Sequence, residues 1–179
     1  MREDIASILL SEEQIHTRVR ELGAEISRDY AGKEPLFVGV LKGCFIFMAD
    51  LFREVTIPGS VDFMAVSSYG NGTSTTGAVK INKDLSQDIE NRDVIIVEDI
   101  LDSGVTLSYL TKYLQNRKPS SICIATLLDK PARRRADVQA KYVGFTVPDA
   151  FVVGYGLDYA EKYRNLPFIG VLKPEVYEK

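Results

Sequence analysis

The sequence has few residues that could form disulfides or a dedicated metal centre. Its 179 residues include two cysteines, Cys44 and Cys123, and one histidine, His16. The cysteines are far apart, form no C-x-x-C pair and lie in apolar runs. We therefore expect both to be small core residues in a reducing compartment. His16 has no cysteine or acid at ligand spacing, so we assign it no role.

Long hydrophobic runs are also absent. No apolar segment reaches the ~18 residues that would cross a bilayer, so we expect no membrane partner. The first ten residues, MREDIASILL, place acidic residues before a short apolar patch, which differs from a secretory signal peptide. We therefore expect a cytoplasmic protein.

The sequence has no excess of positive charge. Its net charge is −3, which disfavours a nucleic-acid partner. The pattern G-x-x-x-x-G-K-[ST] is missing too, which excludes a P-loop ATPase. With 45% hydrophobic residues and this length, the chain suits one globular domain whose core needs no disulfide or metal.

Predicted strands alternate with predicted helices along the chain. Ser11 and Gln14 form a capping box, and apolar residues recur at helical spacing from Ile15 to Ile26, so an amphipathic helix is expected before Gly32. Further helices are predicted at 44–52 and about 105–116. Strands are predicted at 36–41, 61–66, 78–81, 93–97, 122–128, 142–145, 151–153 and 168–172. Apolar strands between helices predict an α/β fold, with a parallel-sheet core flanked by helices.

The strongest functional pattern runs from Val94 to Leu107, VIIVEDILDSGVTL. A buried strand is predicted to lead into the acid pair Glu98 and Asp99, which could bind sugar hydroxyls or a hard cation such as Mg²⁺. A turn at 102–106 then opens a helix, whose N-terminal N–H groups favour a phosphate. Within that turn, Gly104 permits close approach and the hydroxyls of Ser103 and Thr106 add hydrogen bonds.

Each part of this run has an ordinary explanation when taken alone. An Asp-Ser-Gly sequence is often only a helix cap, and paired acids at a strand end are often only solvated. Strand, acid pair, acid-hydroxyl-glycine turn and helix occur together here, and the combination indicates a site for a sugar phosphate.

The run resembles the phosphoribosyl pyrophosphate signature of the type I phosphoribosyltransferases. Nearly the whole chain is similar to the hypoxanthine-guanine branch of that family. The resemblance implies the family's fold, a single domain over 1–179 with a core at about 33–145 and a small hood lobe from about 1–15 and 146–179. It also implies Mg²⁺ as cofactor, small-molecule substrates, and a homodimer or homotetramer. In relatives the peptide between Leu41 and Lys42 can be cis.

Matching the family's motifs residue by residue implies a substrate site. Pyrophosphate would meet Lys42, Gly43 and Arg164, beneath a flexible lid headed by Ser68 and Tyr69 next to the glycine-rich loop 70–77. The phosphoribosyl group would meet Glu98, Asp99, Asp102, Ser103, Gly104, Val105 and Thr106. The purine would meet Lys130, Phe151 and Val152. Asp158, with Glu98 and Asp99, would serve the metal.

The resemblance also implies the roles of two residues. Asp102 would act as the catalytic base, or as a hydrogen-bond partner, near N7 of the purine. Lys130 would favour 6-oxopurines, because an ammonium group can donate to a carbonyl oxygen but cannot accept from an amine. The basic run Arg133, Arg134 and Arg135 is expected to be a solvated face. Ser103 stands where threonine is frequent in relatives, and it keeps the hydroxyl.

The implied reaction is a step of purine salvage. Hypoxanthine or guanine would receive the 5-phosphoribosyl group of phosphoribosyl pyrophosphate, giving IMP or GMP and pyrophosphate. The alternatives are a xanthine-preferring or pyrimidine phosphoribosyltransferase, a nucleic-acid-binding regulator on the same fold, and a non-catalytic nucleotide sensor. Phe151 and Lys130 favour a purine enzyme, and the acidic charge disfavours the regulator.

Overall fold

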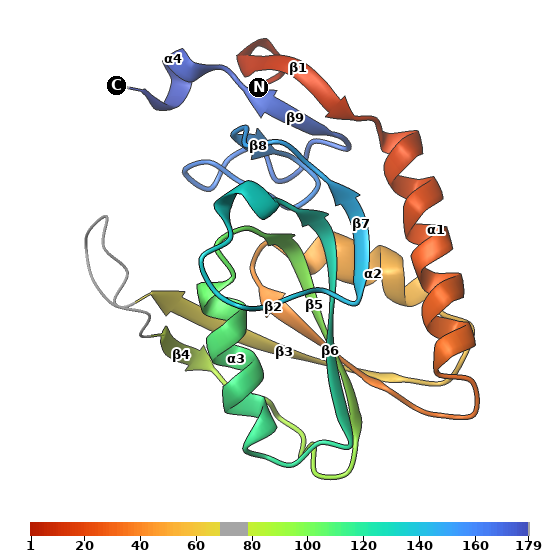
Figure 1. Ribbon diagram of the computed structural model, residues 1–179. Helices are drawn as coiled ribbons and strands as arrows, with labels where there is room; N and C mark the ends of the chain where they lie inside the picture. Colours follow the sequence, from red (N-terminus) through yellow and green to blue (C-terminus); the bar gives the residue numbers. More distant parts are fainter. Residues whose placement is uncertain (69–78, 179) are drawn as a thin grey trace.

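The computed structural model describes residues 1–68 and 79–178, which form two sheets (Figure 1). The larger sheet has six strands in the order β4-β3-β2-β5-β6-β7. They are β2 (Leu36–Leu41), β3 (Ser60–Ser68), β4 (Val79–Lys83), β5 (Asp93–Leu101), β6 (Ser121–Asp129) and β7 (Tyr142–Thr146). All neighbouring strands are parallel except β3 and β4, which are antiparallel. The predicted parallel α/β core is confirmed, with β4 as an antiparallel edge.

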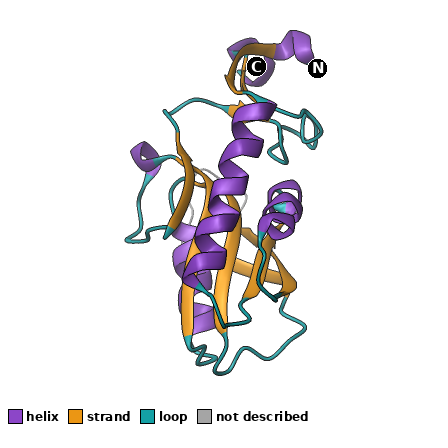
Figure 2. Cartoon of the chain, turned by 90° about the vertical axis from the view of Figure 1, so that its right-hand side faces the viewer, coloured by secondary structure: helices purple, strands orange, loops and turns teal. Residues whose placement is uncertain are grey.

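Helices cover both faces of this sheet. The helix α1 (Glu12–Asp29) lies across one face together with α2 (Phe45–Glu54), as Figure 2 shows, and α3 (Val105–Gln115) packs on the opposite face. The predicted capping box is present, since Gln14 N–H donates to Ser11 Oγ at 3.1 Å and Ser11 N–H donates to Gln14 Oε1 at 2.8 Å. The described helices include none long and apolar enough to cross a membrane.

The central strand β5 is apolar on both sides. Ile95 and Val97 belong to the core cluster beneath α1 and α2, whereas Val94 and Ile96 belong to the cluster beneath α3. This alternation has the period of two expected of a strand, and it explains why the sequence is apolar without interruption. The two cysteines differ in burial, because Cys44 is buried as predicted and Cys123 is only partly buried.

The strand β5 is longer than predicted, and this changes the place of the acid pair. The sequence predicts an end at Val97, but β5 continues to Leu101. Glu98, Ile100 and Leu101 still pair with β6 in parallel register, which keeps the backbone extended beyond the apolar run. Glu98 and Asp99 therefore stand on the strand itself, not in the turn that follows.

A smaller antiparallel sheet joins the two ends of the chain. Its strands, in the order β1-β9-β8, are β1 (Ile5–Leu10), β9 (Ile169–Leu172) and β8 (Val152–Val153). Short helices accompany it, a 3-10 turn at Arg2–Asp4 and α4 (Pro174–Tyr177), and a further 3-10 turn at Pro131–Arg133 follows β6. Both termini lie beside this sheet, above the larger one in Figure 1.

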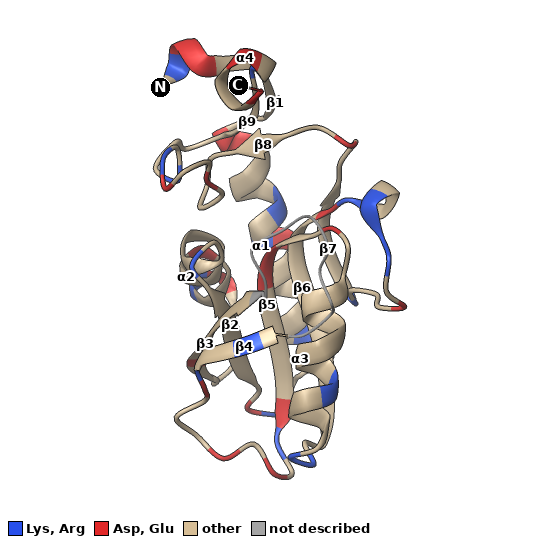
Figure 3. Cartoon of the chain, turned by 90° about the vertical axis from the view of Figure 1, so that its left-hand side faces the viewer, with Lys and Arg blue, Asp and Glu red and all other residues tan. Residues whose placement is uncertain are grey.

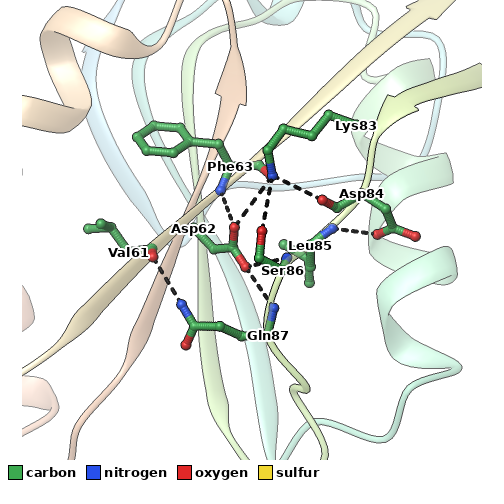
Figure 4. Close-up of polar contacts among 8 residues, drawn as sticks. All are labelled: Val61, Asp62, Phe63, Lys83, Asp84, Leu85, Ser86 and Gln87. Atoms are coloured by element: carbon green, nitrogen blue, oxygen red, sulfur yellow. Dashed lines mark hydrogen bonds and ion pairs between the residues drawn. The ribbon is translucent and has the colours of Figure 1, made fainter.

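A buried carboxylate fixes the edge of the large sheet where β4 ends (Figure 4). Asp62 in β3 is only 5% exposed and accepts from the N–H groups of Phe63 at 2.8 Å, Ser86 at 2.8 Å and Gln87 at 3.1 Å. The Lys83 ammonium lies 3.7 Å away. A buried carboxylate requires such partners.

The predicted loop at 70–77 lies outside the described residues.

Candidate active site

A cavity of about 230 Å³ lies at the carboxyl ends of β2 and β5. This is the edge where parallel sheets bind ligands. All of the predicted phosphoribosyl residues except Val105 line it, together with the end of β2. The lining residues are Val40, Leu41, Gly43, Glu98, Asp99, Ile100, Leu101, Asp102, Ser103, Gly104, Thr106 and Leu107. The peptide between Leu41 and Lys42, at its rim, is cis.

The turn after β5 has the conformation that the sequence predicts for a phosphate loop. Gly104 has φ +76°, and a Cβ there would lie 2.4 Å from Cγ1 of Val138, so only glycine fits. Ser103 N–H donates to Asp102 Oδ1 at 2.7 Å, and Val105 N–H lies 3.4 Å from Ser103 Oγ. The helix α3 then starts at Val105, which puts its N-terminus at the cavity. Val105 itself does not line the cavity in the described structure.

Glu98 and Asp99, the acid pair in this cavity, have no basic residue beside them among the described residues of its lining. Burial raises the pKa of Glu98 well above its usual value, and the neighbouring carboxylate of Asp99 raises it further. Burial also raises the pKa of Asp99, although the nearby Arg164 guanidinium opposes that effect. A Cβ at Gly43 would lie 1.9 Å from Asp99 Oδ2, so the loop after β2 sits directly against this carboxylate. A cation bound here would relieve the cost of burying two acids.

The three predicted metal ligands do not form one cage. Glu98 and Asp99 share the cavity, but Asp158 Oδ1 lies 3.3 Å from Arg164 Nη2, and Asp158 Oδ2 accepts from Glu161 N–H at 2.9 Å. Within residues 1–68 and 79–178, no three His, Cys, Asp or Glu side chains converge on a metal position. One or two carboxylates nevertheless suit Mg²⁺, which usually takes its other ligands from water and substrate phosphates.

The two cations predicted to meet pyrophosphate converge on an acid that the sequence did not reveal. Lys42 Nζ lies 3.2 Å from Glu161 Oε2, and Arg164 Nη2 lies 3.5 Å from Glu161 Oε1. The Lys42 ammonium holds the pKa of Glu161 below its usual value. Arg164 also donates to the Gly156 carbonyl at 2.6 Å, while its buried Nε has no hydrogen-bond partner among the described residues. Glu161 thus takes the place of an anion between the two cations.

A second cavity, of about 530 Å³, lies between the large sheet and the small one. Lys130 follows β6 and is only 8% exposed, so it is not a solvated loop residue. Its Nζ donates to the Ala150 carbonyl at 2.8 Å, which leaves two N–H donors of the ammonium for a ligand. Burial lowers the pKa of Lys130. The cavity is lined by Ala6, Asp102, Lys130, Arg133, Asp149, Ala150, Phe151, Val171, Leu172, Pro174, Tyr177 and Glu178.

An aromatic cluster forms one wall of this second cavity. Phe151, 38% exposed, stacks on Tyr177 with ring centroids 4.6 Å apart and planes at 19°. Tyr159 meets Phe151 edge-on at 5.6 Å. One face of Phe151 is therefore covered, so a flat ligand stacks on the other face or displaces Tyr177. Val152 is buried in β8 opposite Val171 and does not line the cavity within the described structure.

Asp102 joins the two cavities, since it lines both. Its carboxylate therefore stands between the turn predicted to hold a sugar phosphate and the lysine predicted to read a purine. Tyr69 lies outside the described residues, and of Ser68 only the backbone at the end of β3 is described, so the predicted lid stays a prediction.

The prediction of a solvated basic run is wrong for one residue. Arg133 and Arg135 are exposed, but Arg134 is partly buried and bonds to Asp102, Asp129 and Val138. No local pattern distinguishes Arg134 from its neighbours, because its three partners are separated from one another along the chain. Basic and acidic residues are interspersed over sheets and helices elsewhere (Figure 3).

Comparisons with known proteins agree with this fold. The family model described as "Phosphoribosyl transferase domain" matches residues 6–160. A hypoxanthine-guanine phosphoribosyltransferase of Bacillus subtilis (strain 168) is 60% identical over 178 residues, covering 99% of both chains. A hypoxanthine-guanine phosphoribosyltransferase of Staphylococcus aureus (strain Mu50 / ATCC 700699) is 57% identical over 177 residues, which cover 99% of both chains. A crystal structure of a Staphylococcus aureus hypoxanthine phosphoribosyltransferase superposes with a TM-score of 0.98 at 56% identity, over 100% of this chain and 97% of that one.

Proposed function

The chain belongs to the phosphoribosyltransferase family, and from this premise we propose that it makes purine nucleotides by salvage. It transfers the 5-phosphoribosyl group of phosphoribosyl pyrophosphate to hypoxanthine or guanine, giving IMP or GMP and pyrophosphate. The relatives that match over nearly their whole length carry this activity in their names. They give no support to a xanthine-preferring enzyme or to a nucleic-acid-binding regulator.

The position of Asp102 between the two cavities is the observation that carries this proposal. The first cavity supplies a glycine turn and a helix N-terminus for the 5-phosphate, with an acid pair for the ribose hydroxyls. The second supplies Lys130 and the Phe151 ring for a flat base with a carbonyl group. A sugar phosphate and a purine bound in this way meet at Asp102.

On the pyrophosphate side, basic residues neutralise the negative charge of the departing pyrophosphate. The bond from the ribose C1 carbon to pyrophosphate breaks through a cationic, oxocarbenium-like state, as in glycoside chemistry. Lys42 and Arg164 neutralise the departing pyrophosphate oxygens once their ion pairs with Glu161 have broken. Gly43, packed against Asp99, presents the backbone of the loop after β2 to the same group.

Glu98 and Asp99 are the residues that would hold Mg²⁺, with Asp158 contributing from beside Arg164. The ion would supply charge stabilisation of the pyrophosphate oxygens. The raised pKa values of the acid pair fit this role, because both carboxylates lack a matching charge in their cavity. The same carboxylates orient the sugar by accepting from its hydroxyls.

On the purine side, Asp102 accepts the proton that the incoming base loses, near N7. Lys130 donates to the 6-oxo group and stabilises the negative charge that develops there. Phe151 covers one face of the base, and Val152 contributes through the backbone beside it. Water has to be kept from the site, because its attack on phosphoribosyl pyrophosphate is the competing reaction.

We propose that the chain forms a homodimer or homotetramer and works in the cytoplasm. Light scattering on the purified chain would measure the number of subunits.

The test of the activity is product detection from defined mixtures. Protein, Mg²⁺ and phosphoribosyl pyrophosphate are combined with hypoxanthine, guanine, xanthine, adenine or uracil, and nucleotides are separated by chromatography. IMP and GMP are expected, with adenine excluded because Lys130 cannot accept from its amine. UMP or XMP as the main product, or no nucleotide from any base, would overturn the proposal.

A further inference from the structure

We propose that Arg134 is a positioning residue that sets the shape of the ribose-phosphate turn at 102–106 without touching the substrate. This inference rests on the proposed function, since it assigns a role within the same site. Its side chain is 21% exposed, whereas its neighbours Arg133 and Arg135 are exposed. It is the one member of the basic run that points into the protein.

The Arg134 guanidinium bridges three segments. Its Nε donates to the Asp102 carbonyl at 3.0 Å, its Nη1 donates to the Val138 carbonyl at 2.9 Å, and its Nη2 pairs with the Asp129 carboxylate at the end of β6. A planar guanidinium can serve three acceptors at fixed angles, and an ammonium group cannot reproduce that fork. Arg134 thereby ties the turn after β5 to the end of β6.

Backbone hydrogen bonds beside Arg134 hold the same turn, and we call these contacts together with those of the Arg134 guanidinium the clamp. Arg135 N–H donates to the Ser103 carbonyl at 2.8 Å and Ala136 N–H donates to it at 3.1 Å. Val138 meanwhile fills the space where a Cβ of Gly104 would lie. The segment 134–138, part of the β6–β7 connection, thus lies along the outer side of the turn.

The clamp decides which way the peptide groups of the turn face. In a trans peptide the C=O and the following N–H point in opposite directions. The Ser103 carbonyl is held outward by the 134–136 backbone, so the Gly104 N–H faces the opposite side, and Ser103 and Gly104 both line the cavity. Donors fixed in this way before the ligand arrives bind phosphate without reorganisation.

The charge of Arg134 serves the clamp and not the ligand. Asp129 neutralises the guanidinium, and neither residue lines either cavity in the described structure. Loss of Arg134 should therefore disturb phosphate binding through the backbone, while the Lys130 pocket keeps its contacts. This predicts a split between the two substrates that general destabilisation would not produce.

The experiment compares Arg134→Gln and Arg134→Lys with the matched control Arg135→Gln, which removes the same charge one residue away and keeps its backbone N–H. We expect the two Arg134 variants to raise KM for phosphoribosyl pyrophosphate by roughly 10- to 100-fold, as for a small misplacement of a binding group. KM for hypoxanthine should change less than about 3-fold, within the scatter of single-site effects. Arg135→Gln should leave both constants at the wild-type value.

A binding measurement separates this inference from the proposed function. Calorimetric titration with ribose 5-phosphate needs no turnover, and both Arg134 variants should bind it at least about tenfold more weakly than Arg135→Gln. If Arg134→Gln does not fold, Arg134→Lys, which can still pair with Asp129, carries the test. Equal ribose 5-phosphate affinities in folded variants, or equal rises in both KM values, would overturn the positioning role. Absence of turnover in the wild type would instead overturn the proposed function.

Discussion

At Asp102 the side chain and the main chain have separate roles. The carbonyl accepts from Arg134 Nε within the turn at 102–106, whereas Asp102 also lines the second cavity, where we propose that its carboxylate meets the purine. The carboxylate accepts only from its own neighbour, Ser103 N–H, so it is available to a ligand within the described structure. A substitution that alters the side chain alone can therefore separate proton transfer from phosphate binding.

The Asp102→Asn variant makes that separation, because asparagine keeps the shape and removes the ionised acceptor. We expect kcat with hypoxanthine to fall by about 10²- to 10⁴-fold, the usual contribution of a general base. The affinity for ribose 5-phosphate should stay within a few-fold of wild type. Steady-state kinetics and calorimetry on the same preparation measure both quantities, with Asp88→Asn, an exposed aspartate, as control. Undiminished turnover would refute the base assignment and leave the fold intact.

The site residues differ in how visible they are in the sequence. Asp102, Ser103, Gly104 and Thr106 are neighbours in the chain, so a local motif predicts their shared cavity. Contacts of Glu161, Arg134 and Tyr177 depend on segments that meet only in three dimensions. An exposed glutamate between two cations looks like any surface acid in sequence, and one arginine of three looks like the others.

At the scale of elements, predictability followed burial. The strand predicted at 36–41 has those bounds in the structure, because β2 is covered on both faces and is apolar throughout. The sequence does not predict the strand β1, since most of its residues are not buried and its partner among the described residues, β9, begins at Ile169. The sequence predicts an end of β5 at Val97 for a related reason, because Glu98 and Asp99 break the apolar pattern within the strand.

A hydrogen-bonded carboxylate, that of Asp84, links the loop that follows β4 to α3. Asp84 Oδ2 accepts from Tyr113 Oη and from Arg117 Nη2, each at 2.5 Å, and both donors belong to α3 or its end. Burial raises the pKa of Asp84, but hydrogen bonds from Arg117 and Tyr113 outweigh burial and hold it below its usual value. A carboxylate with a lowered pKa stabilises the fold above its unfolded pKa, and that stabilisation is lost as pH falls through the folded pKa.

The Asp84→Asn variant should therefore destabilise the protein in a pH-dependent way. At pH 7 we expect a loss of about 1 kcal/mol in the free energy of unfolding, a value reduced because the pair is about one-third exposed. The difference from wild type should shrink as pH falls below the unfolded value near 3.8. Urea denaturation at pH 7, 5, 3.5 and 2.5 measures it, with the exposed Asp137→Asn as control. A difference that is constant across this range would contradict the ionic origin.

At the scale of the whole molecule, the fold places two cavities around one acid. The first cavity lies at the carboxyl edge of the large sheet, and the small sheet, built from both chain ends, closes the second cavity above it. Sequence periodicity predicted the first sheet, because its strands alternate with helices. The pairing of β1 with β9 joins residues at opposite ends of the chain, and no local pattern encodes it.

This arrangement makes a prediction about how the molecule responds to its ligands. The described residues offer two partly buried acids and no third ligand at one point, so Mg²⁺ alone should bind weakly. Phosphoribosyl pyrophosphate brings further oxygens, and the pair should bind together. A ligand that binds only the folded protein raises the free energy of unfolding as its site fills. The two ligands together, at 100 times their Kd, should add about 2.7 kcal/mol to that free energy, while Mg²⁺ alone adds little.

Thermal unfolding in the presence of Mg²⁺, of phosphoribosyl pyrophosphate with a chelator, and of both, measures this response. The rise in Tm should be largest for the mixture and should exceed the sum of the separate rises, because each ligand completes the site of the other. Glu98→Gln should reduce the excess, since it removes one of the two carboxylates, and Asp137→Asn should not. An equally large rise with Mg²⁺ alone would mean that the protein itself supplies a complete metal cage, which the geometry of Glu98, Asp99 and Asp158 contradicts.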